Sequence, residues 1–386
     1  MNPSSYIAIR SETERICAPL KVEDYIPQPA AFVSPPKWHL GHTSWFFETF
    51  LLTDFRKGYK PFNPHFGYLF NSYYNTLGDR TQRDQRGAMS RPVLAEVMGY
   101  RAHVDKAMLD LLSSADLLNN KGFMHLLAIG LNHEQQHQEL LWTDLKYILG
   151  NNPLFPVYSE GVGLESTITP SDGWVSIDAG IYEIGHDGVG FGYDNEFRRH
   201  KVYLQPYAVQ NGLVSNEDFL EFIMDDGYAR HELWLDEGWA WIQGNEVRSP
   251  LHWHWMDGQW MEYGLGGLHP VNPHQAVCHV SHYEAAAFAE WKGLRLPTEA
   301  EWEVASDHFQ WGERWEHTNS AYLAYPGFRR PDGAVGEYNG KFMMHQMVLR
   351  GASKATPAGH SRKTYRNFFH PNIQWQFSGV RMAKHE

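Results

Sequence analysis

Two histidines four residues apart, His133 and His137, form the stretch of this chain best suited to chemistry. If residues 131–139 are helical, this spacing places both imidazoles on one face, about 5–6 Å apart at Cβ, close enough to share one metal ion. The alternative is a pair of histidines held by hydrogen bonds in the core of a helix bundle. Two ligands hold a metal weakly, so a metal site requires a third ligand from elsewhere in the chain.

The surrounding residues predict the helix that positions this pair. Apolar side chains recur at spacings of three and four residues between Phe123 and Ile148, the pattern of an amphipathic helix. Gly-Asn-Asn-Pro at residues 150–153 then ends the segment. Three further helical segments are expected, at residues 11–17, 38–53 and 93–112. Pro92, directly before the last segment, is a residue type favoured at the first position of a helix. Short connections between helices favour a four-helix bundle, a fold that often holds metals between facing helices.

A third ligand is available on the second of these segments. His42 continues an apolar stripe through Trp45 and Phe46 and is predicted to face inward, whereas His39 is predicted to lie near the polar margin. Three neutral imidazoles on two antiparallel helices could bind Zn²⁺ or Fe²⁺ and leave coordination positions open. For His42 alone, a core histidine hydrogen-bonded to a neighbour remains an alternative.

The same stretch fits the H-E-x-x-H pattern of zinc metalloproteases, in which the glutamate, here Glu134, is the general base. That five-residue pattern also matches unrelated sequences by chance. A protease of this kind needs a carboxylate ligand on a following helix, but the helix ends at Gly150, and Glu160 and Glu165 lie in a glycine-containing connector. The protease interpretation is therefore not favoured.

The loop between the second and third helical segments carries phenols and guanidinium groups. Tyr73 and Tyr74 are adjacent, and a tyrosine can give a proton, or a proton and an electron, to an oxidised metal centre. Arg80, Arg83 and Arg86 follow at three-residue spacing. Arginine forks hold carboxylates through paired hydrogen bonds. The alternative is a surface loop with solvated arginines and half-buried tyrosines.

Length and composition exclude several classes of protein. At 386 residues the chain is too long for one ordinary core, so two domains are expected. The net charge of −12 argues against a nucleic-acid binder. The chain shows no apolar run of membrane-spanning length and no signal pattern, so neither a membrane partner nor export is expected. Cys17 and Cys278 are expected to be free thiols in a reducing cytoplasm.

From Trp174 onward the chain changes to short strands, many glycines and scattered tryptophans, which indicates an α+β domain. Residues 175–177 and 182–185 are expected to pair as a hairpin, and residues 201–209 to form another strand. Three capped helices are expected here, beginning after Ser215, Ser281 and Thr298.

Several motifs carry a resemblance to a known family. Residues 295–303, Arg-Leu-Pro-Thr-Glu-Ala-Glu-Trp-Glu, and residues 377–381, Phe-Ser-Gly-Val-Arg, resemble the signature of the formylglycine-generating-enzyme/sulfatase-modifying-factor domain, which has a C-type-lectin-like fold. The first half resembles the DinB-like four-helix bundle. Together they resemble the non-haem iron sulfoxide synthases of ergothioneine biosynthesis, which join these domains in this order. Further motifs that fit the family lie at residues 71–74, 85–87, 90–92, 133–140 and 365–369.

The resemblance implies a fold class of α followed by α+β. A DinB-like four-helix bundle with the iron site would occupy residues 1–152, a connector residues 153–170, and a C-type-lectin-like domain residues 171–386. Formylglycine-generating enzymes need catalytic cysteines late in the domain, and this sequence has none after Cys278. That activity is therefore not expected.

The resemblance further implies Fe(II) bound by His42, His133 and His137. In this family the metal binds the thiolate of a sulfur donor and an imidazole nitrogen of hercynine (Nα-trimethylhistidine), and O₂ takes the open position. A carbon–sulfur bond forms at C2 of the imidazole and the sulfur is oxidised to the sulfoxide. Four electrons come from the two substrates, so no external reductant is implied.

Residues around the substrates are implied in the same way. Gln136, on the same side of the helix as His133, would hydrogen-bond the substrate imidazole. The loop of Asn367, Phe368 and Phe369 would form a lid, since phenylalanines exclude water and can face a trimethylammonium group through cation–π contact. One of the two adjacent tyrosines would donate a proton, and the sequence does not distinguish them.

A departure from the family pattern bears on the sulfur donor. The branch that uses γ-glutamylcysteine carries Trp-Asp after the equivalent of Asn367, whereas this chain has two phenylalanines there and the paired tyrosines of the branch that uses free cysteine. Cysteine is therefore the expected donor. Its carboxylate would be held by Arg83, with Arg80 and Arg86 as neighbours.

Sister activities remain alternatives: γ-glutamylcysteine or a selenosugar as donor, or histidine as acceptor, as in ovothiol synthases. The last usually carry a fused methyltransferase, which this length excludes. A non-enzymatic alternative is a metal-stabilised binding module. A homo-oligomer is compatible with the sequence.

Overall fold

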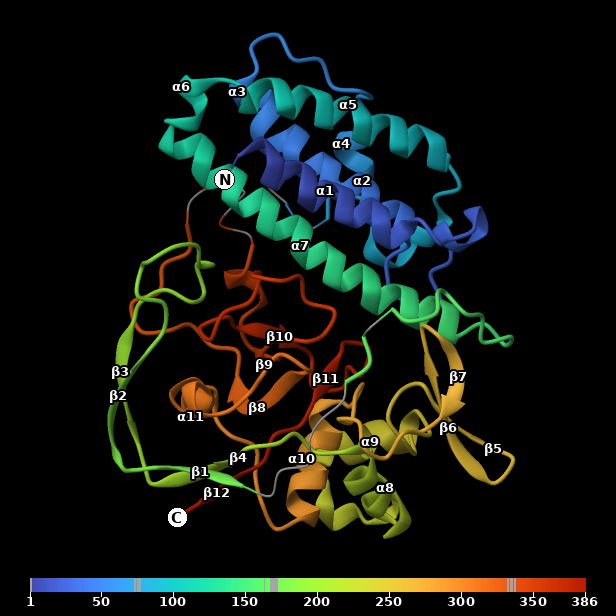
Figure 1. The fold of residues 1–386 in the computed structure, drawn as a ribbon, viewed down its shortest axis with the longest axis vertical. Coiled ribbons are helices and arrows are strands. Elements are labelled where there is room, and N and C mark those ends of the chain that lie inside the picture. The colour runs from blue at the N-terminus through green and yellow to red at the C-terminus, as the bar shows by residue number, and fades with distance from the viewer. Residues whose placement is uncertain are drawn as a thin grey trace. The chain divides into compact units, whose positions relative to one another are not determined.

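The computed structural model describes residues 2–72, 74, 78–162, 164–166, 173–331, 333, 336 and 338–386. The chain forms two compact units, each built around its own core (Figure 1). The bundle unit comprises Met1–Glu160 with Gly333–Glu337, and the second unit comprises Gly161–Asp332 with Tyr338–Glu386. The predicted fold class, α followed by α+β, is confirmed. The predicted boundaries at residues 152 and 171 stay predictions.

Four long helices make up the bundle unit: α1 (Pro3–Cys17), α2 (Pro36–Phe47), α5 (Leu94–Leu112) and α7 (Lys121–Gly150). Helix α2 packs against both α5 and α7, and α1 packs against α7. Shorter elements connect them: η1 (Val22–Tyr25), the π-helical η2 (Glu48–Leu52), α3 (Thr53–Phe55), α4 (Phe66–Leu69), η4 (Arg83–Ala88) and α6 (Ala115–Leu118).

Helix ends differ from prediction where a cap was overlooked. Helix α1 begins at Pro3 rather than at residue 11, because the Asn2 side chain accepts a hydrogen bond from the Ser5 amide and Pro3 occupies the first helical position. Helix α5 begins at Leu94, so Pro92 precedes the helix instead of opening it. Helix α7 runs from Lys121 to Gly150 and confirms the predicted helix and its end.

Two glycines bring aromatic rings close to the helices of the histidine site. A Cβ at Gly130 of α7 would lie 2.8 Å from Cε1 of Phe47 on α2. A Cβ at Gly41 of α2 would lie 2.2 Å from Cε1 of Phe70. Both distances are shorter than any tolerated carbon–carbon contact, so only glycine fits at these two positions.

The described residues of the second unit form four small sheets. The first sheet has the strand order β1 (Trp174–Ile177), β4 (Tyr207–Gln210), β12 (Ala383–His385), and the second has β10 (Asn367–Phe369), β9 (Met347–Gly351), β8 (Trp315–Ala321), β11 (Ser378–Gly379). The third sheet pairs β2 (Gly180–Ile184) with β3 (His200–Leu204). The fourth has the order β5 (Trp253–Met256), β6 (Gln259–Gly264), β7 (Gly267–Pro270). The helical elements of the second unit are α8 (Asn216–Met224), η5 (Gly227–Ala229), η6 (His231–Leu233), α9 (Asp236–Gly244), α10 (His282–Trp291), α11 (Glu299–Ala305), η7 (Ser306–His308) and η9 (Gly340–Phe342).

Strand pairing corrects two predictions. The expected hairpin of residues 175–177 with 182–185 does not form: β1 pairs with β4 and β2 with β3. Alternation of side chains specifies which face of a strand is buried but not which strand is its neighbour. The expected single strand at residues 201–209 is divided into β3 and β4, because Pro206 has no amide hydrogen for a sheet ladder.

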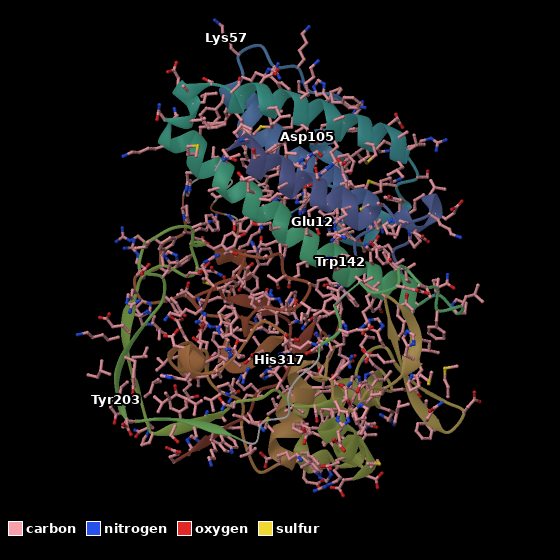
Figure 2. All side chains as sticks on the ribbon, viewed as in Figure 1. Glu12, Lys57, Asp105, Trp142, Tyr203 and His317 are labelled. Atoms are coloured by element: carbon pink, nitrogen blue, oxygen red, sulfur yellow. The ribbon has the colours of Figure 1, made fainter. Side chains whose placement is uncertain are left out.

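The three predicted helix caps of this unit are confirmed. Ser215, Ser281 and Thr298 each accept a hydrogen bond from the amide three residues on, at the start of α8, α10 and α11. Buried side chains fill both units (Figure 2). Cys17 and Cys278 are both buried and neither is in a disulfide, as expected. Among the described helices, none combines the length and apolar character needed to span a lipid bilayer.

Candidate metal site

Helices α2 and α7 bring together the three histidines selected as metal ligands. His42 projects from α2, and His133 and His137 project from α7. One nitrogen from each ring lies within 4.8 Å of those of the other two, and the Nε2 atoms of His42 and His133 are 3.1 Å apart. Among the described residues, this is the one group of three or more potential ligands arranged in this way.

Burial keeps these imidazoles neutral. It lowers the pKa of His133 to about 3, and burial together with the neighbouring histidines lowers the pKa of His42 and of His137 well below the usual range. Neutral imidazoles have a lone pair to give to a metal, whereas imidazolium ions have none. Three such nitrogens, with no thiolate or carboxylate in the group, suit Zn²⁺ or Fe²⁺.

The Nδ1 atom of His42 forms a hydrogen bond with the backbone. His42 Nδ1 lies 2.7 Å from the carbonyl oxygen of Phe70, a group that can only accept a hydrogen bond. Nδ1 therefore carries the proton, and the lone pair is left on Nε2, the atom that faces His133. The close approach of Phe70 to Gly41 places this carbonyl against the helix.

The prediction for His39 is wrong. His39 lies in the interior with 1% of its surface exposed, 2.9 Å from both His137 Nδ1 and Asp144 Oδ2. Every residue of α2 is buried, so this helix has no polar margin on which a histidine could lie. The absence of charged residues between Trp38 and Phe47 is the sequence signal that could have revealed this.

Aromatic and cationic groups form a continuous stack beside the site. The guanidinium carbon of Arg86 lies 3.4 Å from the ring centre of Trp38. The His42 ring stacks on Trp38 at 4.4 Å and 12° and on Trp45 at 5.4 Å and 16°. Tyr74, also buried, packs against Trp45 at 5.5 Å. These two stacking contacts help to fix the orientation of the His42 ring.

Arg86 is the most buried of the three predicted arginines. It donates hydrogen bonds to the hydroxyls of Ser34 and Ser72, at 2.8 and 3.0 Å, and 5% of its surface is exposed. Burial, and after it the neighbouring Arg83, lowers the pKa of this guanidinium well below its usual value. Among the described residues no carboxylate lies within 4.0 Å of this guanidinium, and Asp144 acts on it only at longer range.

The other two arginines lie on the same loop in different surroundings. Arg80 donates to the carbonyl oxygen of Ser72 at 3.1 Å, and Arg83 is exposed and donates to the carbonyl oxygen of Phe32. Gln136 is half-buried on α7, three residues after His133. Tyr73 lies outside the described residues.

Asn367, Phe368 and Phe369 form an edge strand, β10, rather than the predicted loop. Pairing with β9 supplies these residues with a sheet ladder that their sequence alone did not reveal. Phe368 stacks on Tyr322 at 4.0 Å and 12°. These residues belong to the second unit, and their part in substrate binding stays a prediction.

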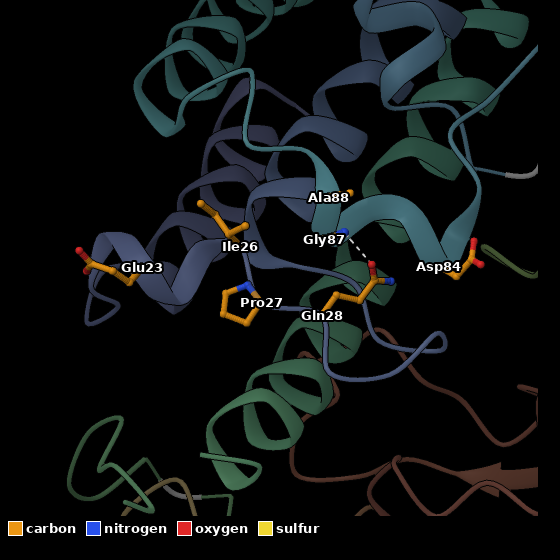
Figure 3. A pocket seen from close by; sticks show the side chains of 7 residues that line it. All are labelled: Glu23, Ile26, Pro27, Gln28, Asp84, Gly87 and Ala88. Carbon is orange, nitrogen blue, oxygen red and sulfur yellow. Dashed lines mark hydrogen bonds between the residues drawn. The ribbon is translucent and has the colours of Figure 1, made fainter. Parts of the chain in front are cut away.

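Gln28 ties the arginine loop to the preceding segment. Its side-chain amide donates to the carbonyl oxygens of Val33 and Arg83, at 2.7 and 2.6 Å. It also accepts a hydrogen bond from the Gly87 amide at 2.6 Å, which Figure 3 shows. A Cβ at Gly87 would lie 2.5 Å from Cβ of Gln28, so this contact requires glycine. An open surface cavity of about 310 Å³ lies here, lined by Glu23, Ile26, Pro27, Gln28, Asp84, Gly87 and Ala88.

Glu134 is not placed to act as a general base, because its carboxylate is held by other side chains. Its carboxylate accepts hydrogen bonds from Arg10, Arg101 and Thr13, at 2.9, 2.6 and 2.8 Å, in a fully buried position. Burial opposes ionisation, but Arg10 and Arg101 outweigh it and hold the pKa of Glu134 below its usual value. A carboxylate clamped in this way is a poor proton acceptor, which counts against the metalloprotease interpretation.

Comparisons with known proteins cover both units. A model of the DinB superfamily matches residues 6–141, and a model of sulfatase-modifying factor enzyme 1-like domains matches residues 164–321. Hercynine oxygenases from Mycolicibacterium smegmatis and Mycobacterium tuberculosis are each 27% identical, over 91% of this chain and 91% of their own lengths. A formylglycine-generating enzyme from Thermomonospora curvata is 32% identical over 35% of this chain and 48% of its own length.

Proposed function

We propose that the chain belongs to the hercynine oxygenase family and that it is an Fe(II)- and O₂-dependent sulfoxide synthase. It joins the sulfur of cysteine to C2 of the hercynine imidazole and oxidises that sulfur, giving hercynylcysteine sulfoxide. The observation that carries the proposal is the convergence of three buried, neutral imidazoles, His42, His133 and His137, at one point.

The two substrates together supply all the electrons that O₂ accepts in this reaction, so no other reductant is needed. Replacing the C2–H and S–H bonds by a C–S bond removes two electrons and two protons from the substrates. Oxidation of the thioether to the sulfoxide removes two more electrons. One O₂ accepts all four, placing one oxygen atom on sulfur and releasing the other as water. A bound Fe(II) would supply the dioxygen-activating redox chemistry that protein side chains lack.

The chain's own residues would bind and orient the substrates. Arg86, buried and held by Ser34 and Ser72, would offer its remaining donors to the carboxylate of cysteine in place of Arg83, which donates to the carbonyl oxygen of Phe32. Gln136 would hydrogen-bond the hercynine imidazole from the helix that carries two of the ligands. Tyr74, buried against Trp45, is the described candidate for the proton donor, with Tyr73 as the other.

Oxygen uptake by Fe(II)-loaded protein, with the product mass recorded, tests the proposal. Hercynine would be supplied with cysteine, with γ-glutamylcysteine or alone, and a His42→Ala variant would serve as control. We expect uptake and a hercynylcysteine sulfoxide mass with cysteine, one ¹⁸O in the product from ¹⁸O₂, and neither with the variant. Turnover with γ-glutamylcysteine only would overturn the choice of donor. No uptake with either thiol, despite bound iron, would favour a sister substrate such as a selenosugar.

A further inference from the structure

A buried chain of hydrogen-bonding groups runs from one metal ligand to a carboxylate. His137 Nδ1 lies 2.9 Å from His39 Nδ1, and His39 Nε2 lies 2.9 Å from Asp144 Oδ2. The same carboxylate oxygen accepts a hydrogen bond from the Ser34 amide at 2.9 Å. His39 and Asp144 are each 1% exposed and His137 is 8% exposed, so water does not compete for these contacts.

The positions of the protons in this chain follow from its carboxylate end. An ionised carboxylate can only accept hydrogen bonds, so His39 Nε2 must carry the proton that it shares with Asp144. If this is the one proton on the His39 ring, the lone pair lies on Nδ1. His39 Nδ1 must accept, and His137 Nδ1 must donate.

We infer that His39 and Asp144 are positioning residues that hold His137 in the tautomer able to bind the metal through Nε2. With the proton fixed on its Nδ1, His137 keeps its lone pair on Nε2, as His42 does through the Phe70 carbonyl. A partner that ends in a carboxylate also makes the ligand a stronger electron donor than a carbonyl partner does.

The places of these residues in the sequence fit this role. Asp144 lies two helical turns after His137 on α7, so both face the same side of that helix. His39 lies three residues before His42 on α2. The chain of hydrogen bonds therefore joins the two helices that carry all three ligands, close to the ligand atoms themselves.

The alternative is that His39 is only a satisfied core residue, and two substitutions at this position separate the possibilities. His39→Leu removes both hydrogen bonds while filling similar volume. His39→Gln keeps one acceptor and one donor and should restore the chain. Asp144→Asn keeps an oxygen that can accept from both Ser34 and His39 but removes the charge, and remains informative if His39→Leu does not fold.

Two measurements that do not need turnover form the test. The first is the dissociation constant for Co(II) or Fe(II) alone, and the second is the ¹⁵N chemical shifts of His137 in the metal-free protein. We expect His39→Leu to weaken metal binding about 10–100-fold, His39→Gln to bind close to wild type, and Asp144→Asn to fall between them. His137 Nδ1 should be protonated in wild type and in His39→Gln, and the two tautomers should mix in His39→Leu.

A His39→Leu protein that is less stable but keeps both the metal dissociation constant and the His137 tautomer would overturn the inference. A wild-type His137 protonated on Nε2 would overturn it as well. The inference rests on the proposed function only for the identity of the metal. If the tautomer and metal-binding results hold while no substrate pair gives turnover, the proposed reaction fails and the positioning role stands.

Discussion

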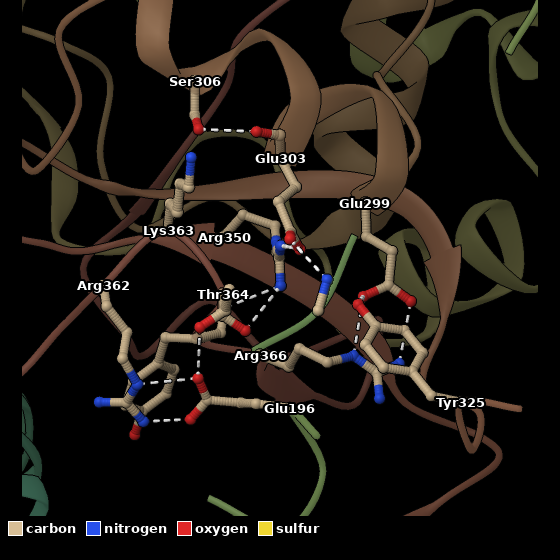
Figure 4. A network of polar contacts seen from close by, with 12 residues as sticks. Glu196, Glu299, Glu303, Ser306, Tyr325, Arg350, Arg362, Lys363, Thr364 and Arg366 are labelled. Atoms are coloured by element: carbon tan, nitrogen blue, oxygen red, sulfur yellow. Dashed lines mark hydrogen bonds and ion pairs between the residues drawn. The ribbon is translucent and has the colours of Figure 1, made fainter. Parts of the chain in front are cut away.

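Two buried clusters, one in each unit, hold their polar side chains in opposite ways. In the bundle unit, three imidazoles converge with neutral nitrogens facing one another and no opposite charge among them. In the second unit, arginines and glutamates are buried as matched pairs, including Glu299 with Arg366 and Glu303 with Arg350 (Figure 4). The first arrangement has nitrogen atoms that a metal ion could bind, and the second pairs each charge with an opposite one.

This difference separates a reactive site from a scaffold. A buried ion pair is near break-even in energy when formed, yet costs about 3–5 kcal/mol when one partner is removed. Such a pair stabilises one arrangement of the fold and has no lone pair to offer a ligand. Converging lone pairs are costly to bury unless something binds them. A metal ion resolves that cost, which is why the histidines and not the arginine–glutamate pairs are the expected centre of chemistry.

The largest expected effect comes from removing one member of the converging set. His137→Ala leaves two ligands, so the dissociation constant for Fe(II) or Co(II) should rise by more than about 100-fold, beyond what loss of an outer partner costs. Turnover should be lost with it. Metal titration and oxygen uptake measure the two effects.

His125→Ala is the matched control, because His125 lies exposed on the same helix. It should leave metal binding and turnover unchanged. Equal effects from both variants would show that the protein binds metal through scattered surface histidines, and the proposed site would be wrong.

The matched pairs of the second unit should show the opposite behaviour. Glu303→Gln leaves Arg350 buried without its carboxylate, and Glu303 also accepts from the Gly185 amide at 2.7 Å. We expect the free energy of unfolding to fall by about 3–5 kcal/mol. The metal dissociation constant of the folded protein should stay at the wild-type value. Denaturant unfolding and metal titration test both halves, and weakened metal binding with unchanged stability would erase the distinction between the two clusters.

The sequence predicted the reactive cluster better than its surroundings. Metal ligation requires particular residue types at helical spacing, and both are visible in the sequence, so His42, His133 and His137 could be selected together. The role of His39 could not, because its place depends on α2 being covered on all sides. Helix caps were predictable because they are local, whereas the pairing of β1 with β4 depends on chain segments 30 residues apart.

The same contrast divides the two sides of one helix, since Glu134 follows the ligand His133 directly. Glu134→Gln removes the charge that pairs with Arg10 and Arg101, and should lower the free energy of unfolding by about 3 kcal/mol. Turnover per bound metal should change little. A metalloprotease-type general base predicts the reverse, a stable protein without activity. Chemical denaturation and activity normalised to bound metal decide between them.

A smaller effect is expected where the scaffold supports substrate binding instead of the metal. Gln28→Ala removes three hydrogen bonds that hold the backbone of the loop carrying Arg83 and Arg86. Each bond contributes about 1 kcal/mol, so looser placement of the arginines should raise KM for cysteine about tenfold with kcat little changed. A fall in kcat at unchanged KM would mean that this loop acts on the chemical step.

His317 of the second unit provides the last test, because it is a buried histidine outside the group of metal ligands. Burial lowers the pKa of His317 to about 4, partly offset by its hydrogen bond to the Val280 carbonyl oxygen. In the unfolded chain this histidine takes up a proton near its ordinary pKa of about 6.5. The unfolded state therefore binds more protons between these values, and stability is present above about pH 6.5 and is lost as pH falls toward 4.

His317→Gln keeps a donor for Val280 but cannot titrate. The slope of unfolding free energy against pH between 5 and 6 should therefore be shallower than in wild type by about 1.4 kcal/mol per pH unit. Metal should leave this difference unchanged, since His317 has no part in the ligand set. Denaturant unfolding at several pH values, with and without metal, measures it. If added metal abolished the difference, the two kinds of buried histidine would be energetically coupled, and the separation of scaffold from site drawn above would not hold.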